Sequence, residues 1–156
     1  MASWTTFEQA APELAASVAA LLDAHRHKTL ATLRRDGSPR ISGTEADLRD
    51  GELWIGSMPG ALKARYLLRD PRFALHSGSD DPPEWPGDAK LAGHAVEVTD
   101  PAAFEAARSK ETPPGPFHLF RLDLHEVSTV GLTEDRKALV IRLWTPEGGV
   151  REMTRT

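Results

Sequence analysis

Apolar residues in the first part of the chain recur at the spacing of a helix. They stand at i, i+4, i+7 and i+8, at Leu14, Val18, Leu21 and Leu22. Pro12 suits the first turn of such a helix, and Glu13 suits the positive end of its dipole. The cationic run from His25 to Lys28 suits its C-terminus. The pattern therefore predicts an N-terminal helix at about residues 12–27.

After this helix the pattern changes to short β-prone runs separated by turns. Asp36-Gly37 and Asp50-Gly51 each lie between extended runs, which is the strongest short-range signal of a hairpin. The predicted strands are 29–34, 39–48, 52–57, 72–77, 89–99, 117–124 and 137–144. Short helices are predicted at 61–69 and 101–108, with a loop at 78–88, a proline-rich connector at 110–116 and a polar tail at the end.

So many strands joined by tight turns indicate a mainly β fold with peripheral helices, arranged as a small antiparallel β-barrel. Closing the sheet would remove the exposed edges that many short strands otherwise create. No internal repeat or linker divides the chain. Because a domain holds roughly 100–200 residues, the expected organisation is one domain over residues 1–156.

Composition narrows the possible functions. The net charge is −4 and the isoelectric point is about 5.9. These values exclude a protein whose main function is to bind nucleic acid, because such a protein needs positive charge to neutralise the phosphates. The absence of cysteine excludes disulfides, thiolate zinc sites and cysteine nucleophiles. The histidines lie on or near separate predicted strands, so no metal site is expected. No stretch has the ~20 apolar residues of a membrane span, and no basic region precedes an apolar core at Met1–Trp4, so a cytoplasmic protein without a membrane partner is expected.

The candidate chemistry lies between Ser57 and Arg65. A strand ends in the hydroxyl of Ser57, Pro59-Gly60 forms a turn, and a helix follows with Lys63 near its first turn. Free N–H groups, a lysine and a hydroxyl together form an anion site. Arg40, at the start of a preceding strand, is expected beside it. Strand–Pro-Gly–helix segments with basic residues are more often ordinary solvated connections, so that alternative stays open. Codon bias stays open as the origin of the 14 arginines against 5 lysines.

The order of motifs resembles the pyridoxamine 5′-phosphate oxidase-like FMN-binding split-barrel superfamily. The resemblance spans roughly residues 25–151 and is specific because an Asp-Gly hairpin, a Lys-Ala-Arg helix and an Asp-Pro-Arg end follow in the right order. It rests on the runs Leu30-Ala31-Thr32-Leu33 to Asp36-Gly37-Ser38-Pro39-Arg40-Ile41-Ser42, Leu53-Trp54-Ile55-Gly56-Ser57 to Lys63-Ala64-Arg65, and Arg69-Asp70-Pro71-Arg72.

This resemblance implies a six-stranded antiparallel split β-barrel that forms a homodimer and binds FMN, or alternatively the deazaflavin F420, between subunits. It implies that Arg40 and Lys63 hold the flavin phosphate with the hydroxyl of Ser57, and that the strand from Arg40 to Glu45 follows the ribityl chain and ring. Trp144 and Arg151 match residues that reach the cofactor from the partner chain. The full set of implied cofactor-binding residues is Arg40, Ile41, Ser42, Gly43, Thr44, Gly56, Ser57, Leu62, Lys63, Trp144 and Arg151.

The chain also departs from its resemblance to the true oxidase. Where that enzyme has an arginine-rich substrate strand, this chain has Lys90-Leu91-Ala92-Gly93, and the closing Arg-Leu-x-x-x-Arg motif is absent. Oxidation of pyridoxamine phosphate is therefore not expected. Tyr66 stands where many relatives have asparagine. Glu45, expected beside the ring, either repels the anion of reduced flavin or points outward on the other face of its strand.

The resulting hypothesis is an FMN-dependent oxidoreductase that transfers hydride to or from a small molecule of unknown identity. The alternatives are an F420-dependent reductase of the same fold, a non-catalytic protein that binds flavin or haem, and an interaction domain whose basic helix start is merely solvated. No Ser-His-Asp order or paired carboxylates suggest a protein catalytic group, so the chemistry would come from the cofactor. No catalytic residue is assigned.

Overall fold

The computed structural model describes all residues, 1–156, and its centre is one antiparallel sheet. The strands are β1 (His27–Leu33), β2 (Pro39–Glu45), β3 (Asp47–Arg49), β4 (Glu52–Ser57), β5 (Arg72–His76), β6 (Asp88–Glu97), β7 (His118–Leu132), β8 (Leu139–Thr145) and β9 (Gly149–Arg155). The helices are α1 (Trp4–Ala10), α2 (Pro12–Asp23), α3 (Leu62–Arg69) and α4 (Pro101–Ala107). None of them is long and apolar enough to cross a bilayer.

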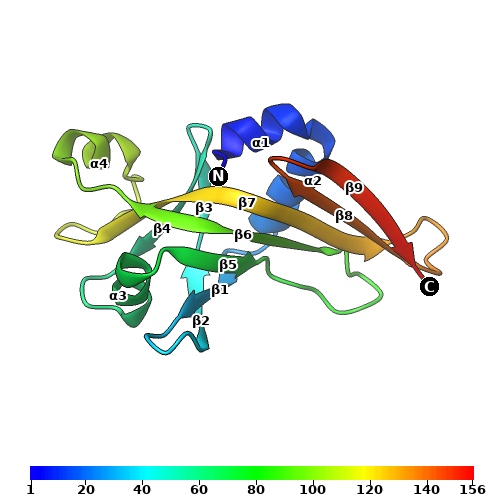
Figure 1. Cartoon of the computed structure of the whole chain (residues 1–156), viewed down its shortest axis with the longest axis horizontal. Helices are drawn as coiled ribbons and strands as arrows, with labels where there is room; N and C mark the ends of the chain where they lie inside the picture. The colour runs from blue at the N-terminus through cyan, green and yellow to red at the C-terminus, as the bar shows by residue number, and fades with distance from the viewer.

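The strands follow the order β2-β1-β5-β6-β7-β4-β3, and β8 and β9 extend the sheet from β7 (Figure 1). The long strand β7 makes this branching possible, because its first residues pair with β4 and its last residues pair with β8. No ladder joins β2 to β3 or β4, so the sheet curls without closing. The fold is thus the expected mainly β split barrel with peripheral helices, but its sheet has nine strands where six were expected.

A bulge in the longest strand pair depends on glycine. The register of β6 and β7 shifts between Ala92 and Gly93. A Cβ atom added to Gly93 would overlap the backbone carbonyl of Asp123, so the two backbones approach more closely than a larger residue permits. The bulge lets these strands bend while they stay paired on both sides of it.

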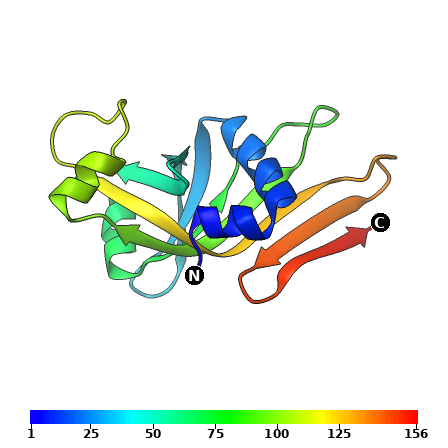
Figure 2. The ribbon, with the colours of Figure 1, turned by 90° about the horizontal axis from the view of Figure 1, so that it is seen from above.

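The two N-terminal helices cover the sheet near the β8–β9 hairpin (Figure 2). Phe7 of α1 is fully buried, with its ring centroid 5.2 Å from that of Trp4 and 4.8 Å from that of Trp144 on β8. The α2 residues Leu14, Val18 and Leu22 belong to the same buried cluster. The start of the chain is therefore tied to its last strands through one aromatic contact.

Several boundaries differ from the sequence prediction. The N-terminal helix ends at Asp23, before residue 27, because His27 and Lys28 already pair with β2. Helix α1 was not predicted, although the Ser3 side chain accepts a hydrogen bond from the backbone N–H of Thr6 as an N-cap. The predicted polar tail is wrong: residues 149–155 form β9, whose side chains are all exposed and which is held by backbone pairing with β8.

Replacing Phe7 by alanine should lower the free energy of unfolding by about 3–5 kcal/mol, the usual cost of deleting a buried phenylalanine. Urea denaturation followed by circular dichroism measures this change. Glu8→Ala, on the exposed side of the same helix, is the matched control and should change stability by less than about 0.5 kcal/mol. A loss below about 1 kcal/mol for Phe7→Ala would show that α1 is not part of the core.

Candidate functional site

The side chains of β2 alternate between two different environments. One face is half-buried or buried and the other is exposed, as expected for a strand with a period of two. The inner face carries Arg40, Ser42 and Thr44, and the outer face carries Ile41, Gly43 and Glu45. The predicted phosphate ligand Arg40 therefore shares a face with two hydroxyl side chains.

Helix α3 brings Lys63 against this inner face. The turn before the helix contains Gly60 at φ +77°, a conformation that glycine adopts without strain. Lys63 Nζ donates a hydrogen bond to Thr44 Oγ1 over 3.2 Å. Burial lowers the pKa of Lys63, Glu45 acts in the opposite direction, and the positive charge of Arg40 lowers it further. Lys63 and Arg40 are thus near enough to sense each other's charge.

Neither of these two cations is paired with a carboxylate, since no ion pair of the chain involves Arg40 or Lys63. Arg40 Nη1 and Ser42 Oγ are buried without a hydrogen-bond partner, and so is Oγ1 of Thr32, which pairs with Arg40 in the β1–β2 ladder. Buried polar atoms normally have partners. Unpartnered donors beside two free cations fit a phosphate group.

Tyr66 fixes the surroundings of Arg40. The Arg40 guanidinium lies 5.8 Å from the centroid of the Tyr66 ring, and that of Arg69 lies 4.9 Å from it. Arg69 also donates a hydrogen bond to the carbonyl of Leu33. Cation–π contacts of this kind hold an arginine without neutralising it. Tyr66, at the position where many relatives have asparagine, therefore holds the Arg40 guanidinium without removing its charge.

A pocket of about 650 Å³ opens next to these residues, between β2, β4, the start of α3 and the connector that precedes β7. Five of the predicted cofactor-binding residues line it: Gly43, Thr44, Gly56, Ser57 and Lys63. A Cβ atom on Gly56 would lie 3.3 Å from the ring of Phe117, so glycine lets that ring lie against β4. The only hydrogen bond from the Ser57 hydroxyl is a 3.5 Å contact to the carbonyl of Met58, which leaves the hydroxyl available to a ligand.

The remaining predicted residues do not line the pocket. Arg40, Ile41 and Ser42 belong to the adjoining part of β2, and Leu62 begins α3. Trp144 packs against Phe7 in the core with 2% of its surface exposed. This burial leaves Trp144 no surface for a cofactor held by another subunit, and we do not propose that role for it. Arg151 lies on the exposed strand β9.

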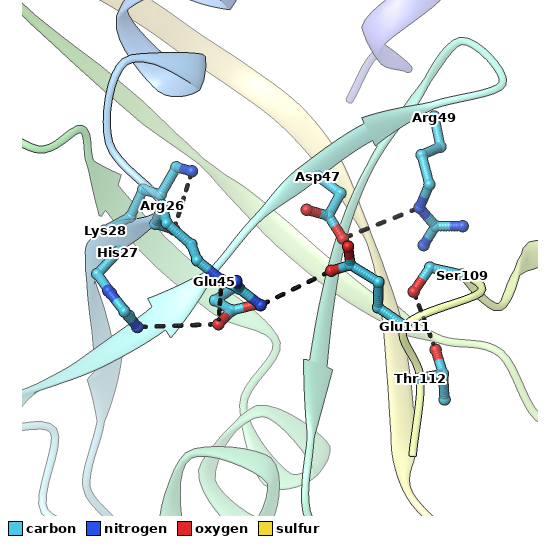
Figure 3. A network of polar contacts seen from close by, with 9 residues as sticks. All are labelled: Arg26, His27, Lys28, Glu45, Asp47, Arg49, Ser109, Glu111 and Thr112. Atoms are coloured by element: carbon cyan, nitrogen blue, oxygen red, sulfur yellow. Dashed lines mark hydrogen bonds and ion pairs between the residues drawn. The ribbon is translucent and has the colours of Figure 1, made fainter. Parts of the chain in front are cut away.

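A network of charged side chains closes one side of the pocket (Figure 3). Arg26 donates to both carboxylate oxygens of Glu45, over 2.9 Å and 3.4 Å, and its Nη2 lies 3.7 Å from Glu111 of the connector. His27 Nε2 lies 3.8 Å from the Glu45 carboxylate. Hydrogen bonding to Arg26 lowers the pKa of Glu45. Glu45 lies on the exposed face of β2 and lines the pocket, with its charge paired with Arg26.

Arg26 was not among the predicted site residues, because its place in the cationic run suggested a helix end. The signal that identifies it is the hairpin register. The Asp36-Gly37 turn leads to a ladder in which His27 faces Glu45, and this register brings Arg26 next to that carboxylate. Arg49, also part of the pocket wall, donates to the carbonyl of Ala107 and so ties β3 to the end of α4.

Fold and site together define a class of proteins: antiparallel split barrels with a cationic site between β2 and the helix α3 that follows β4. The chain belongs to the pyridoxamine 5′-phosphate oxidase family within the FMN-binding split-barrel superfamily, since the model of that family matches residues 14–131. The comparison with curated proteins finds no match.

Solved structures show the same fold at low sequence identity. A pyridoxamine 5′-phosphate oxidase-related, FMN-binding protein from Nostoc punctiforme is 17% identical, with a TM-score of 0.61 over 96% of this chain and 97% of that chain. PhzG from Burkholderia lata, solved with tetrahydrophenazine-1-carboxylic acid, is 16% identical, with a TM-score of 0.61 over 92% and 88%. An FAD-binding protein from Mesorhizobium loti is 22% identical, with a TM-score of 0.58 over 73% and 91%.

The Arg26–Glu45 pair should make stability depend on acid pH. Because the pKa of Glu45 is lowered from its ordinary value of 4.5 in the folded state, the pair stabilises the fold above that pH and is lost as the pH falls through the folded value. Glu45→Gln should therefore be less stable than the wild type near neutral pH, and the difference should vanish once the pH falls below the lowered pKa of Glu45 in the folded protein. Urea denaturation at a series of pH values measures it. A difference that stays constant with pH would contradict this origin.

Proposed function

We propose that this chain binds FMN and uses it as an oxidoreductase acting on a small molecule. The observation that carries the proposal is the pair of carboxylate-free cations, Arg40 and Lys63, beside the buried and unpartnered hydroxyl of Ser42. Membership of the family supports a flavin as the ligand. The substrate is not assigned.

The phosphate of FMN fits the inner face of β2. A phosphate monoester carries close to two negative charges near neutral pH and three strong acceptor oxygens. Arg40 and Lys63 would supply the balancing charge, and the hydroxyl of Ser42 would donate one further hydrogen bond. Charge-assisted bonds of this kind are about twice as strong as neutral ones. The residues present therefore fit the group.

The flavin ring fits the pocket that continues from this face. Its volume of about 650 Å³ lies within the range of small-molecule sites, roughly 300–1,000 Å³. Gly43 and Gly56 leave the backbone of β2 and β4 accessible there, and the Ser57 hydroxyl is free to donate. When bound, a flavin supplies hydride transfer, while the chain orients the cofactor and the connector at residues 109–117 screens it from water.

A second copy of the chain would complete the site. Three large apolar side chains, on β2, in the turn before α3 and at the start of α3, are strongly exposed: Ile41 at 69%, Met58 at 77% and Leu62 at 46%. Met58 also lines the pocket. Exposed apolar side chains that cluster next to a binding site often mark an interface. We therefore propose that a homodimer contact lies beside the site, with the cofactor between the subunits.

The arginines favour FMN over F420. The acidic tail of F420 needs a row of free cations beyond the phosphate site. Arg72 is paired with Asp70 over 2.6 Å, and Arg69 is occupied by Tyr66 and the Leu33 carbonyl. Arg65 and Arg69 both lack a carboxylate partner, but only Arg65 is also without a cation–π contact or a side-chain hydrogen bond. Arg65, Arg69 and Arg72 therefore do not form the row of free cations that such a tail needs.

Removing either cation should weaken the binding of FMN but not the binding of riboflavin. Arg40→Ala and Lys63→Ala should each raise the Kd for FMN by about ten- to a hundredfold, since a hydrogen bond to a charged group contributes about 1.5–3 kcal/mol. Titration of flavin fluorescence measures the Kd.

Two controls make this result specific. Riboflavin lacks the phosphate, so its Kd should be the same for both variants and the wild type. Arg142→Ala removes an arginine that pairs with Glu152 on the β8–β9 hairpin and should leave FMN binding unchanged. Equal losses for FMN and riboflavin, or no loss at all, would refute the phosphate assignment.

A further inference from the structure

The carboxylate of Glu45 is the negative charge that competes most directly for Lys63. Glu45 follows Thr44, the residue whose hydroxyl holds the Lys63 ammonium at 3.2 Å. Both Glu45 and Lys63 line the cofactor pocket, and Glu45 also lines an adjoining cavity of about 790 Å³. A lysine side chain is long and flexible enough to leave a neutral hydroxyl for a carboxylate.

Arg26 prevents this competition in the structure. Its guanidinium binds Glu45 with two nitrogens, over 2.9 Å and 3.4 Å, on the outer face of β2 (Figure 3). The fork geometry matches a carboxylate and orients both of its oxygens. The backbone also assists, since successive side chains of a strand point to opposite faces and Glu45 starts away from Thr44. Lys63 consequently has no carboxylate within 4 Å.

We propose that Arg26 is a positioning residue that holds Glu45 away from Lys63 and so keeps the Lys63 ammonium free for the phosphate of the cofactor. This inference rests on the proposed function, because FMN is the ligand whose phosphate Lys63 would bind. Without Arg26, Glu45 turns toward Lys63, neutralises it and presents its own negative charge to the phosphate. Arg26 thus acts on the cofactor through Glu45, without contacting the cofactor.

The proposal predicts a rescue between two sites. Arg26→Ala should raise the Kd for FMN by about five- to tenfold, through the loss of one favourable charge interaction at partly exposed groups. Glu45→Gln in the same chain should restore the Kd to within about twofold of the single Glu45→Gln variant, because no competing carboxylate then remains. Arg26→Lys, which keeps the charge but not the fork, should lie between the wild type and Arg26→Ala. Fluorescence titration of FMN measures all four variants.

Several results would overturn the proposal. An unchanged Kd in Arg26→Ala would remove its basis. A double variant as weak as Arg26→Ala would mean that Arg26 acts through the fold or by its own contact. Glu111→Gln removes only the 3.7 Å contact between Arg26 and the connector, so a loss there equal to that of Arg26→Ala would assign the effect to the connector. If Arg26→Ala does not fold, Arg26→Gln takes its place in the same comparison.

A second readout separates this proposal from the proposed function. Competitive labelling of amines with trinitrobenzenesulfonate, quantified by mass spectrometry of the Lys63 peptide, reports how much of Lys63 is neutral, without any flavin. Pairing with Glu45 raises the pKa of Lys63, so labelling should slow in Arg26→Ala and recover in Arg26→Ala/Glu45→Gln. If the wild type does not bind FMN, the proposed function fails and the labelling still decides the role of Arg26. Equal labelling in all variants would overturn that role.

Discussion

The alternation of side chains along β2 is the constraint on which the candidate site depends. A strand sends consecutive residues to opposite faces, so one short segment presents Arg40, Ser42 and Thr44 inward while Glu45 points outward. This separation lets a carboxylate stand next to a phosphate site without neutralising it. Helix α3 completes the arrangement by supplying Lys63 to the inner face.

The structure keeps stability and binding in different places. The aromatic contacts of Trp4, Phe7 and Trp144 lie in the core beneath α1 and α2. The unpartnered polar atoms of Thr32, Arg40 and Ser42 gather on neighbouring residues of β1 and β2. Leaving polar groups buried without partners costs free energy, and a phosphate in this position would recover it. Such local costs are characteristic of binding sites held by a stable scaffold.

Local patterns predicted most of the fold. The Asp-Gly turns, the apolar spacing of α2 and the Pro-Gly turn before α3 are signals carried by a few neighbouring residues. Each located its element, although α2 ends at Asp23 and the predicted strand 39–48 is divided into β2 and β3. The exposed strand β9 escaped prediction because its formation depends on backbone pairing with β8, which leaves no apolar pattern. Helix α1 is short, and its stability comes from Phe7 meeting Trp144 from the far end of the chain.

In the candidate site, too, residues in continuous motifs could be predicted, and residues brought together by strand pairing could not. Thr44, Ser57 and Lys63 could be placed because they lie in continuous motifs that a family resemblance identifies, and the structure brings them into one pocket. Arg26 could not be assigned to the site from the sequence, because its partner Glu45 becomes a neighbour only through the register of β1 and β2. Trp144 was assigned to the cofactor by position in the sequence, whereas its large apolar surface is buried in the core.

Native mass spectrometry of the protein, produced in a host that contains both FMN and F420, tests the central claim most directly. The account predicts a dimer that carries two molecules of FMN and loses them when Arg40 and Lys63 are both replaced by alanine. A protein that carries F420 would contradict the choice of cofactor. A protein that remains free of flavin even after incubation with excess FMN would contradict the proposed function itself.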